Sequence, residues 1–92
     1  GLYIFDEPES ALSINSLYTL MVKMHELEKK NSQFIIATHS PILLAYPGAD
    51  IYTITDHGFE PTRYEESMPY LLTKQFILNR ERVLDELLGE EK

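Results

Sequence analysis

Hydrophobic and polar positions follow two different periods in the first thirty residues. Residues 2–5 are apolar and rich in strand-forming side chains, and they lead directly into the carboxylates of Asp6 and Glu7. Pro8 then excludes a continued central strand. Apolar residues next recur at three- and four-residue steps, as on one helix face: Ile14, Leu17, Tyr18, Met21, Met24 and Leu27. The pattern predicts a strand at residues 2–6, followed by a helix with Ser13 as N-cap.

A second apolar segment, residues 33–38, has consecutive rather than alternating apolar positions in its centre. Strands that are covered on both faces have this pattern, as in parallel sheets. Strand, helix and strand in this order predict a parallel βαβ unit. Because parallel strands end at the same edge of a sheet, Asp6, Glu7 and His39 are expected side by side at the edge where α/β proteins bind ligands.

The remaining pattern predicts a strand pair and helices. Residues 50–55 are expected to form a third strand, and residues 59–64 an antiparallel edge strand, because Pro61 is excluded from central positions. Two apolar stripes, separated by Asn79, predict C-terminal helices: Leu71, Leu72, Phe76 and Ile77, then Val83, Leu84, Leu87 and Leu88. The predicted fold class is α/β, with a parallel βαβ sheet, an antiparallel edge strand and C-terminal helices.

Composition narrows the classes of function. The 92 residues carry a net charge of −7, which argues against a nucleic-acid backbone surface in this segment. The sequence has no cysteine, so it contains neither a disulfide framework nor a thiolate zinc site, as is common in cytoplasmic proteins. No apolar run approaches the roughly 20 residues of a membrane span. The chain opens directly on a strand, and we expect it to be a piece of a longer protein.

Three motifs in order resemble one protein family. Leu2-Tyr3-Ile4-Phe5-Asp6-Glu7 resembles the Walker B motif of ATP-binding-cassette (ABC) ATPases, Glu9-Ser10-Ala11-Leu12-Ser13 their D-loop, and Ile36-Ala37-Thr38-His39-Ser40 their switch-histidine segment. Finer details are similar to a soluble branch of predicted bacterial AAA-type ATPases. The resemblance implies a partial P-loop NTPase fold: residues 1–65 would be the C-terminal part of the ATPase core, and residues 66–92 a C-terminal helical segment.

The resemblance also implies roles for individual residues. Asp6 would hold Mg²⁺, usually through water, and Glu7 would act as the general base. His39 would contact the γ-phosphate of ATP and stabilise the transferred phosphoryl group, as suits phosphoryl transfer. Ser10 lies in the segment similar to the D-loop and is a further nucleotide-binding candidate, although it can also cap a helix. In that family two domains close on ATP as a dimer, and their D-loops touch.

Two departures limit what this chain is expected to do alone. The phosphate loop G-x-x-x-x-G-K-[ST] and the serine-glycine signature motif are both absent from its sequence. Ser13 stands where transporter D-loops usually carry aspartate. In the family, the strand that bears the phosphate loop lies between the switch-histidine strand and the next, so residues 50–55 should lack a neighbour on one side. We expect the chain by itself to be catalytically inactive.

Two alternatives remain open at this stage. The C-terminal apolar stripes would also suit a non-enzymatic interaction or dimerisation module, or a cover for an open face of the sheet. A part of a DNA repair or recombination ATPase is the other alternative, because some relatives of the soluble branch clamp DNA. A non-functional interpretation exists for each candidate residue taken alone. Asp6 and Glu7 could be solvated carboxylates of a turn, and His39 could be a packed histidine. Their combination with the three ordered motifs favours the ATPase hypothesis.

Overall fold

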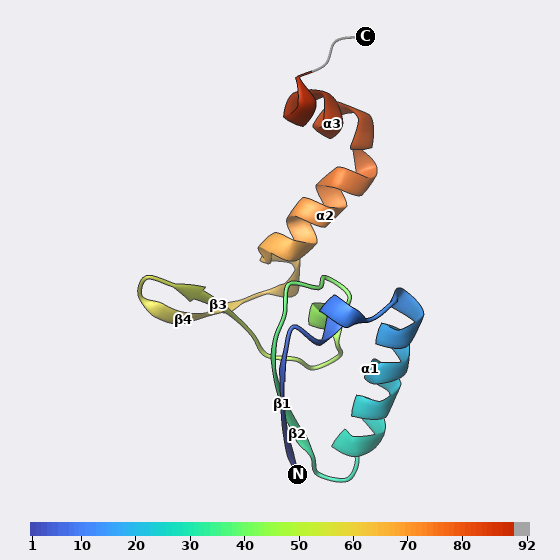
Figure 1. Ribbon diagram of the computed structural model, residues 1–92. Coiled ribbons are helices and arrows are strands. Elements are labelled where there is room, and N and C mark those ends of the chain that lie inside the picture. The colour runs from blue at the N-terminus through green and yellow to red at the C-terminus, as the bar shows by residue number, and fades with distance from the viewer. Residues whose placement is uncertain (90–92) are drawn as a thin grey trace. The chain divides into compact units, whose positions relative to one another are not determined.

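The structure divides into two units between Ala49 and Asp50. The computed structural model describes residues 1–89, so residues 90–92 of the predicted C-terminal segment lie outside the described part (Figure 1). The functional division expected from the sequence, between residues 65 and 66, concerns the complete ATPase domain and stays a prediction. The first unit contains β1, α1 and β2, and the second contains β3, β4, α2 and α3.

The first unit is the predicted βαβ arrangement. Strand β1 covers Leu2–Asp6, helix α1 covers Ile14–Glu28 and strand β2 covers Gln33–Ala37. The two strands pair in parallel, with Leu2 opposite Gln33 at one end and Asp6 opposite Ala37 at the other. Two short 3₁₀ turns complete the unit, η1 at Pro8–Ala11 and η2 at Leu43–Ala45. The parallel register confirms the α/β fold class.

Local chemistry sets both ends of α1. The Ser13 side chain accepts a hydrogen bond from the Ser16 backbone N–H at 3.1 Å, as an N-cap does. After the last turn, Asn31 adopts a left-handed conformation with φ of 68°, which asparagine tolerates better than most residues. Both ends lie where the sequence predicted them.

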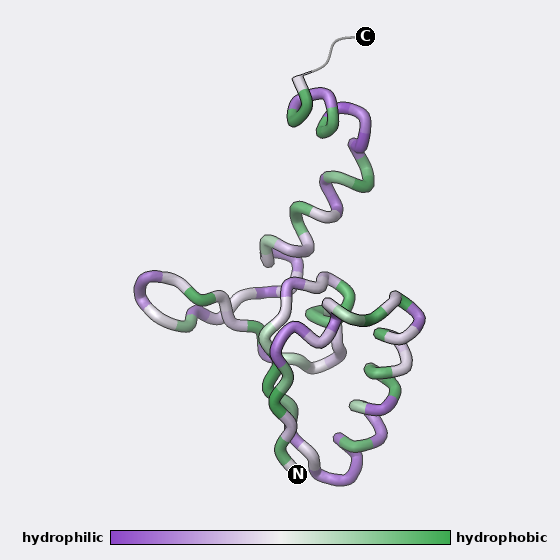
Figure 2. The backbone as a smooth tube through the Cα atoms, in the orientation of Figure 1, coloured by the Kyte–Doolittle hydropathy of each residue, from purple (hydrophilic) through white to green (hydrophobic). Residues whose placement is uncertain are grey.

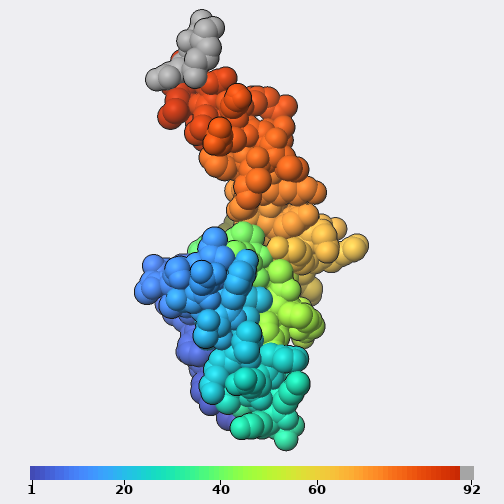
Figure 3. Space-filling model, turned by 90° about the vertical axis from the view of Figure 1, so that its right-hand side faces the viewer, coloured from blue at the N-terminus to red at the C-terminus, as the bar shows by residue number. Residues whose placement is uncertain are grey.

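A small core joins α1 to one face of the strand pair. Its buried members are Leu17 and Met24 of α1 and Leu43 of η2. Partly buried apolar residues surround them: Leu20, Met21, Phe34, Ile36, Ile42 and Tyr46. The rings of Tyr3 and Phe34 stack on the same face at a centroid distance of 5.1 Å. Figure 3, turned so that α1 faces the viewer, shows the helix residues in blue to cyan in front of the strands.

The opposite face of the strand pair is exposed, which corrects one prediction. The consecutive apolar residues of β2 indicated a strand covered on both sides, yet Ile35 is 53% exposed and Ile4, its partner on β1, is 70% exposed. The central parts of both strands are hydrophobic (Figure 2). The physical reason for the difference is that the unit places a helix on one face only, so alternate residues have nothing to pack against.

The second unit begins with a hairpin. Strand β3 covers Ile51–Thr55 and pairs antiparallel with β4, Gly58–Thr62, across the turn formed by Asp56 and His57. Gly58 has a φ of 105°, a conformation that side chains rarely adopt. Within residues 1–89, β3 pairs with β4 and with no other strand, so β1–β2 and β3–β4 are separate two-stranded sheets. The antiparallel partner containing Pro61 is confirmed.

Two helices follow the hairpin. A 3₁₀ turn, η3 at Tyr64–Glu66, leads to α2 at Met68–Leu78 and α3 at Arg80–Leu88. Asn79 separates them with φ −132° and ψ 41°, as the interruption in the apolar stripes predicted. The stripe on α2 is exposed, with exposed fractions of 43% for Leu71 and 68% for Ile77. In the described part of the chain, no helix has the length and apolar character needed to cross a membrane.

Candidate functional site

The two parallel strands end together and deliver polar residues to one edge. The ladder extends one step past β1, because the Glu7 N–H donates to the Ala37 carbonyl at 2.7 Å. Glu7 then takes a left-handed conformation with φ of 50° and ψ of 55°, which is uncommon for a residue with a long side chain. Strained backbone of this kind clusters at functional sites, where the surrounding structure holds it.

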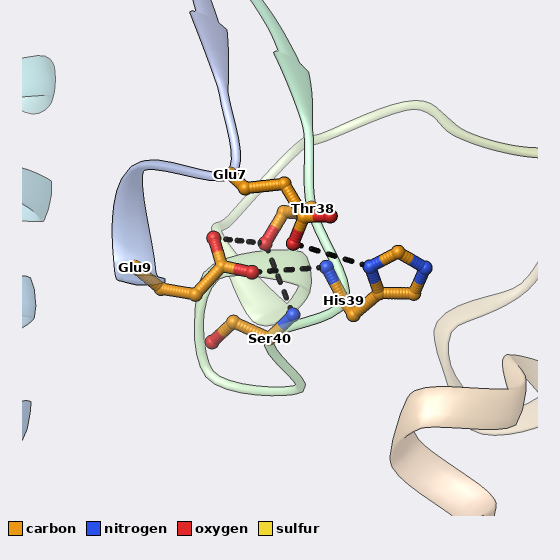
Figure 4. Close-up of polar contacts among 5 residues, drawn as sticks. All are labelled: Glu7, Glu9, Thr38, His39 and Ser40. Atoms are coloured by element: carbon orange, nitrogen blue, oxygen red, sulfur yellow. Dashed lines mark hydrogen bonds and ion pairs between the residues drawn. The ribbon is translucent and has the colours of Figure 1, made fainter. Parts of the chain in front are cut away.

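Glu7 and His39 meet at this edge, although 32 positions separate them. The Glu7 Oε1 atom lies 3.2 Å from Nδ1 of the His39 ring. The ring is 81% exposed and the carboxylate side chain 45% exposed, so both remain accessible to a ligand. In Figure 4 the second ring nitrogen of His39 faces away from the carboxylate. The sequence-based prediction that parallel strands bring these two side chains together agrees with this geometry.

A second carboxylate, Glu9 of η1, holds the segment that carries His39. Its Oε1 accepts a hydrogen bond from the Thr38 hydroxyl at 2.6 Å, and its Oε2 accepts one from the His39 backbone N–H at 3.1 Å. The Thr38 hydroxyl oxygen in turn accepts from the Ser40 N–H at 3.0 Å. These contacts, shown in Figure 4, link η1 to three consecutive residues after β2.

Ser40 connects this network to the core. Its hydroxyl oxygen accepts from the Leu43 N–H at 3.1 Å and its carbonyl from the Leu44 N–H at 3.0 Å. Ser40 is buried, and Leu43 is one of the three buried hydrophobic residues. The edge of the site is therefore continuous with the packed core.

The environment of Glu9 changes its titration. Partial burial acts to raise its pKa, but hydrogen bonds from the Thr38 hydroxyl and from the His39 N–H favour the ionised form, and the net result is a pKa below the usual value of 4.5. Glu9 is therefore a carboxylate at neutral pH. Its two hydrogen bonds are charge-assisted, which makes them stronger than neutral ones.

This lowered pKa predicts an acid-dependent loss of stability. A carboxyl whose folded-state pKa lies below its unfolded value stabilises the fold above 4.5, and this contribution is lost as the pH falls through the lowered folded value. We expect the unfolding midpoint of the unmodified chain to fall more steeply, as the pH decreases below 4.5, than that of Glu9→Gln. Thermal unfolding followed by circular dichroism measures both; parallel pH profiles would contradict the assignment.

Asp6 and Ser10 were the other two candidate residues at this edge. Asp6 is the last residue of β1 and its side chain is exposed. Ser10 is exposed in η1, where its backbone N–H donates to the Glu7 carbonyl at 3.1 Å. The nucleotide-binding and metal roles of these two residues stay predictions, as do the catalytic roles of Glu7 and His39.

The carboxylates that follow β1 are oxygen donors of the kind that Mg²⁺ takes in proteins. Among residues 1–89, no group of three or more histidine, cysteine, aspartate or glutamate side chains is gathered to hold a metal ion. Mg²⁺ at phosphate sites, however, commonly takes one or two protein carboxylates and completes its shell with phosphate and water oxygens. Asp6 and Glu7 are consecutive carboxylates at the end of β1, and a magnesium role for Asp6 stays a prediction.

Sequence reasoning missed the role of Glu9. It noted this residue only as part of a segment similar to a D-loop and assigned it no contact. The signal that was present is its position directly after Glu7-Pro8, on the turn that leaves the same edge as β1. The missing information was the conformation of η1, which turns the side chain toward Thr38.

Comparison with known proteins supports the resemblance drawn from the motifs. Residues 1–45 match the family model described as an AAA domain, putative AbiEii toxin, Type IV TA system. Over 90 residues the chain is 32% identical to an uncharacterized ABC transporter ATP-binding protein of Haemophilus influenzae. That alignment covers 97% of this chain and 33% of the relative, so the chain spans about a third of the relative's length. No solved structure matches this chain. The two matches support a fragment of a P-loop ATPase of the AAA or ABC kind.

Proposed function

We propose that this chain supplies the carboxylate and histidine edge of an ATP-hydrolysing site in a longer, ABC-type P-loop ATPase. The observation that carries the proposal is the contact of 3.2 Å between Glu7 and His39 at the common end of two parallel strands. Both groups are accessible there. Phosphoryl transfer is catalysed mainly by positioning and charge stabilisation, for which an accessible carboxylate and imidazole are suitable groups.

Glu7 is the proposed general base. A base must reach the water that attacks the phosphorus, directly or through one further water. The half-exposed carboxylate meets this requirement at the edge where a ligand enters. Its left-handed backbone turns the chain away from the ladder immediately after β1, so the side chain stands beyond the last strand pair.

His39 is proposed to contact the phosphoryl group through its outer nitrogen. When the ring is protonated, Nδ1–H donates to Glu7 Oε1 and Nε2–H remains free to donate to a phosphate oxygen. Such a donor stabilises the negative charge that develops in the transition state. The exposed ring and its orientation away from Glu7 in Figure 4 suit this contact.

Asp6 is the proposed magnesium residue. A bound Mg²⁺ would neutralise charge on the phosphate oxygens. Asp6 would hold it through water at the end of β1, next to the base, and Ser10 would lie near the same nucleotide. ATP and Mg²⁺ are accordingly the cofactors that we propose for the complete protein.

The other parts of the site are proposed to come from outside this sequence. No segment of the form G-x-x-x-x-G-K-[ST] occurs in it, and backbone N–H groups with a lysine are what normally hold the β- and γ-phosphates. We therefore propose that the 92-residue chain alone neither holds nor hydrolyses ATP. In the complete protein, residues 9–13 would contact a second copy, and hydrolysis would be coupled to opening of that dimer.

A histidine substitution tests the proposal. In the complete protein, His39→Ala is expected to lower kcat for ATP hydrolysis by about 10²-fold, because it removes one donor to the transition state. His57→Ala is the matched control, since His57 lies in the turn of the β3–β4 hairpin. Steady-state phosphate release at saturating ATP measures both. Equal rates for His39→Ala and the unmodified protein would contradict the proposal.

The exposed apolar stripe on α2 favours a second candidate, an interaction module without catalysis. Phe76 is 39% exposed and Leu72 is 55% exposed. Exposed apolar side chains that lie together can mark a surface that binds another protein. The same assay distinguishes the candidates. Complete absence of ATP hydrolysis by the unmodified complete protein would favour the interaction module.

A further inference from the structure

We propose that Glu9 is a positioning residue, whose carboxylate holds residues 38–40 so that the His39 ring is presented to the ligand. The inference deepens the proposed function and rests on it. Glu9 belongs to η1, which lies between β1 and the helix α1 and follows the proposed base Glu7. Two hydrogen bonds of its carboxylate reach the segment after β2, 29 and 30 residues away.

The carboxylate restrains the segment at two successive residues. One oxygen takes the Thr38 hydroxyl proton at 2.6 Å and the other takes the His39 N–H at 3.1 Å. Since the Thr38 oxygen also accepts from the Ser40 N–H, a third residue is held indirectly. One ionised side chain thereby determines the backbone directions on both sides of His39.

The restraint matters because little else limits the His39 side chain. The ring is 81% exposed, and its hydrogen bond in the described structure is the one to Glu7. An exposed ring on a mobile backbone samples several rotamers, and most of these rotamers do not align the ring with a bound phosphate. Fixing the backbone at residues 38–40 reduces this loss before the ligand binds, which is a contribution to kcat rather than to ATP affinity.

The chemistry of the pair predicts which substitution restores function. Glu9→Ala removes both acceptors. In Glu9→Gln the amide oxygen can still accept from the His39 N–H. The amide N–H₂ group can donate to the Thr38 oxygen, so this hydrogen bond persists with its direction reversed. We therefore expect the glutamine variant to retain most of the geometry, although it lacks the charge that strengthens both bonds.

Kinetics of the complete protein test the role. Glu9→Ala is expected to lower kcat by about 10-fold and to change KM for ATP by less than about twofold, and Glu9→Gln should recover most of kcat. Glu26→Gln on α1 is the matched control, because Glu26 is an exposed carboxylate whose ion pair to Lys23 is 3.9 Å long. An unchanged kcat in Glu9→Ala, or a loss that appears only in KM, would overturn the positioning role.

A readout that does not depend on hydrolysis accompanies the kinetics. In complete protein labelled with ¹⁵N-histidine, the His39 amide is assigned by its disappearance in His39→Gln. Glu9→Ala should move this amide resonance upfield and speed its exchange with solvent about 10-fold, because the bond to the carboxylate is lost. An amide that keeps its shift and its exchange rate would overturn the restraint.

Failure of this inference is distinguishable from failure of the proposed function. If His39→Ala lowers kcat and Glu9→Ala does not, the proposed function stands and the positioning role is overturned. If His39→Ala also has no effect, both are overturned. Thr38→Val provides a second variant should Glu9→Ala not fold: it removes the hydroxyl between Glu9 and Ser40, and a kcat loss in the same direction supports the role, whereas an unchanged kcat overturns it.

Discussion

Replacing Glu7 by glutamine in the complete protein is expected to lower kcat for ATP hydrolysis by about 10³-fold, with ATP affinity changed by less than about twofold. Glutamine has nearly the same size as glutamate and can still accept a hydrogen bond from Nδ1 of His39, which lies 3.2 Å away in the unmodified chain. What it loses is the ability to take a proton from water. The substitution therefore separates catalysis from binding and from local geometry.

Single-turnover hydrolysis and equilibrium binding of ATP measure the two quantities separately. Glu26→Gln again controls for removal of one negative charge, since Glu26 lies on α1, away from the polar network at the strand ends. A Glu7→Gln protein that hydrolyses ATP within about threefold of the unmodified rate would exclude Glu7 as the base. Loss of binding together with hydrolysis would indicate a structural role for Glu7.

Truncating Leu17 is expected to destabilise the first unit by about 2–5 kcal/mol. Leu17 is 4% exposed, and it is one of three buried hydrophobic residues in the described chain, so its removal leaves a cavity in a core with few other contacts. Small domains have total stabilities of only about 5–15 kcal/mol. We expect Leu17→Ala to remove a large part of the stability of this unit and to lower its unfolding midpoint.

Val22→Ala is the matched control for the core. Val22 lies on the same helix and is 60% exposed, so its truncation should change the free energy of unfolding by less than about 0.5 kcal/mol. Urea titration, followed by the helical circular dichroism signal, measures the free energy of unfolding of both variants. Equal losses for Leu17→Ala and Val22→Ala would show that the core does not lie between α1 and the strands.

Much of the first unit follows from local pattern. The three- and four-residue spacing of apolar side chains in α1, the cap at Ser13 and the left-handed Asn31 each depend on a few neighbouring residues, and all were predictable. The convergence of Glu7 and His39 was also predictable, because parallel strands that are joined by one helix must end at one edge. In these respects topology follows from element order alone.

Two features were not predictable from pattern, for physical reasons. The contacts of Glu9 depend on the conformation of η1, which follows a left-handed glutamate that no periodicity indicates. The exposed face with Ile4 and Ile35 misled the prediction, because consecutive apolar residues record that a strand is suited to burial on both sides and not what covers it in this chain. The apolar pattern of a strand indicates that the strand can pack on both faces. Which elements cover those faces depends on the rest of the structure.

The most direct test of the central claim is a structure of the complete protein with Mg²⁺ and a non-hydrolysable ATP analogue. Our account predicts that the γ-phosphate lies at the common end of β1 and β2, with Nε2 of His39 within hydrogen-bond distance and the Glu7 carboxylate facing the position of the attacking water. A γ-phosphate bound elsewhere, with both Glu7 and His39 beyond hydrogen-bond and water-mediated reach, would contradict it.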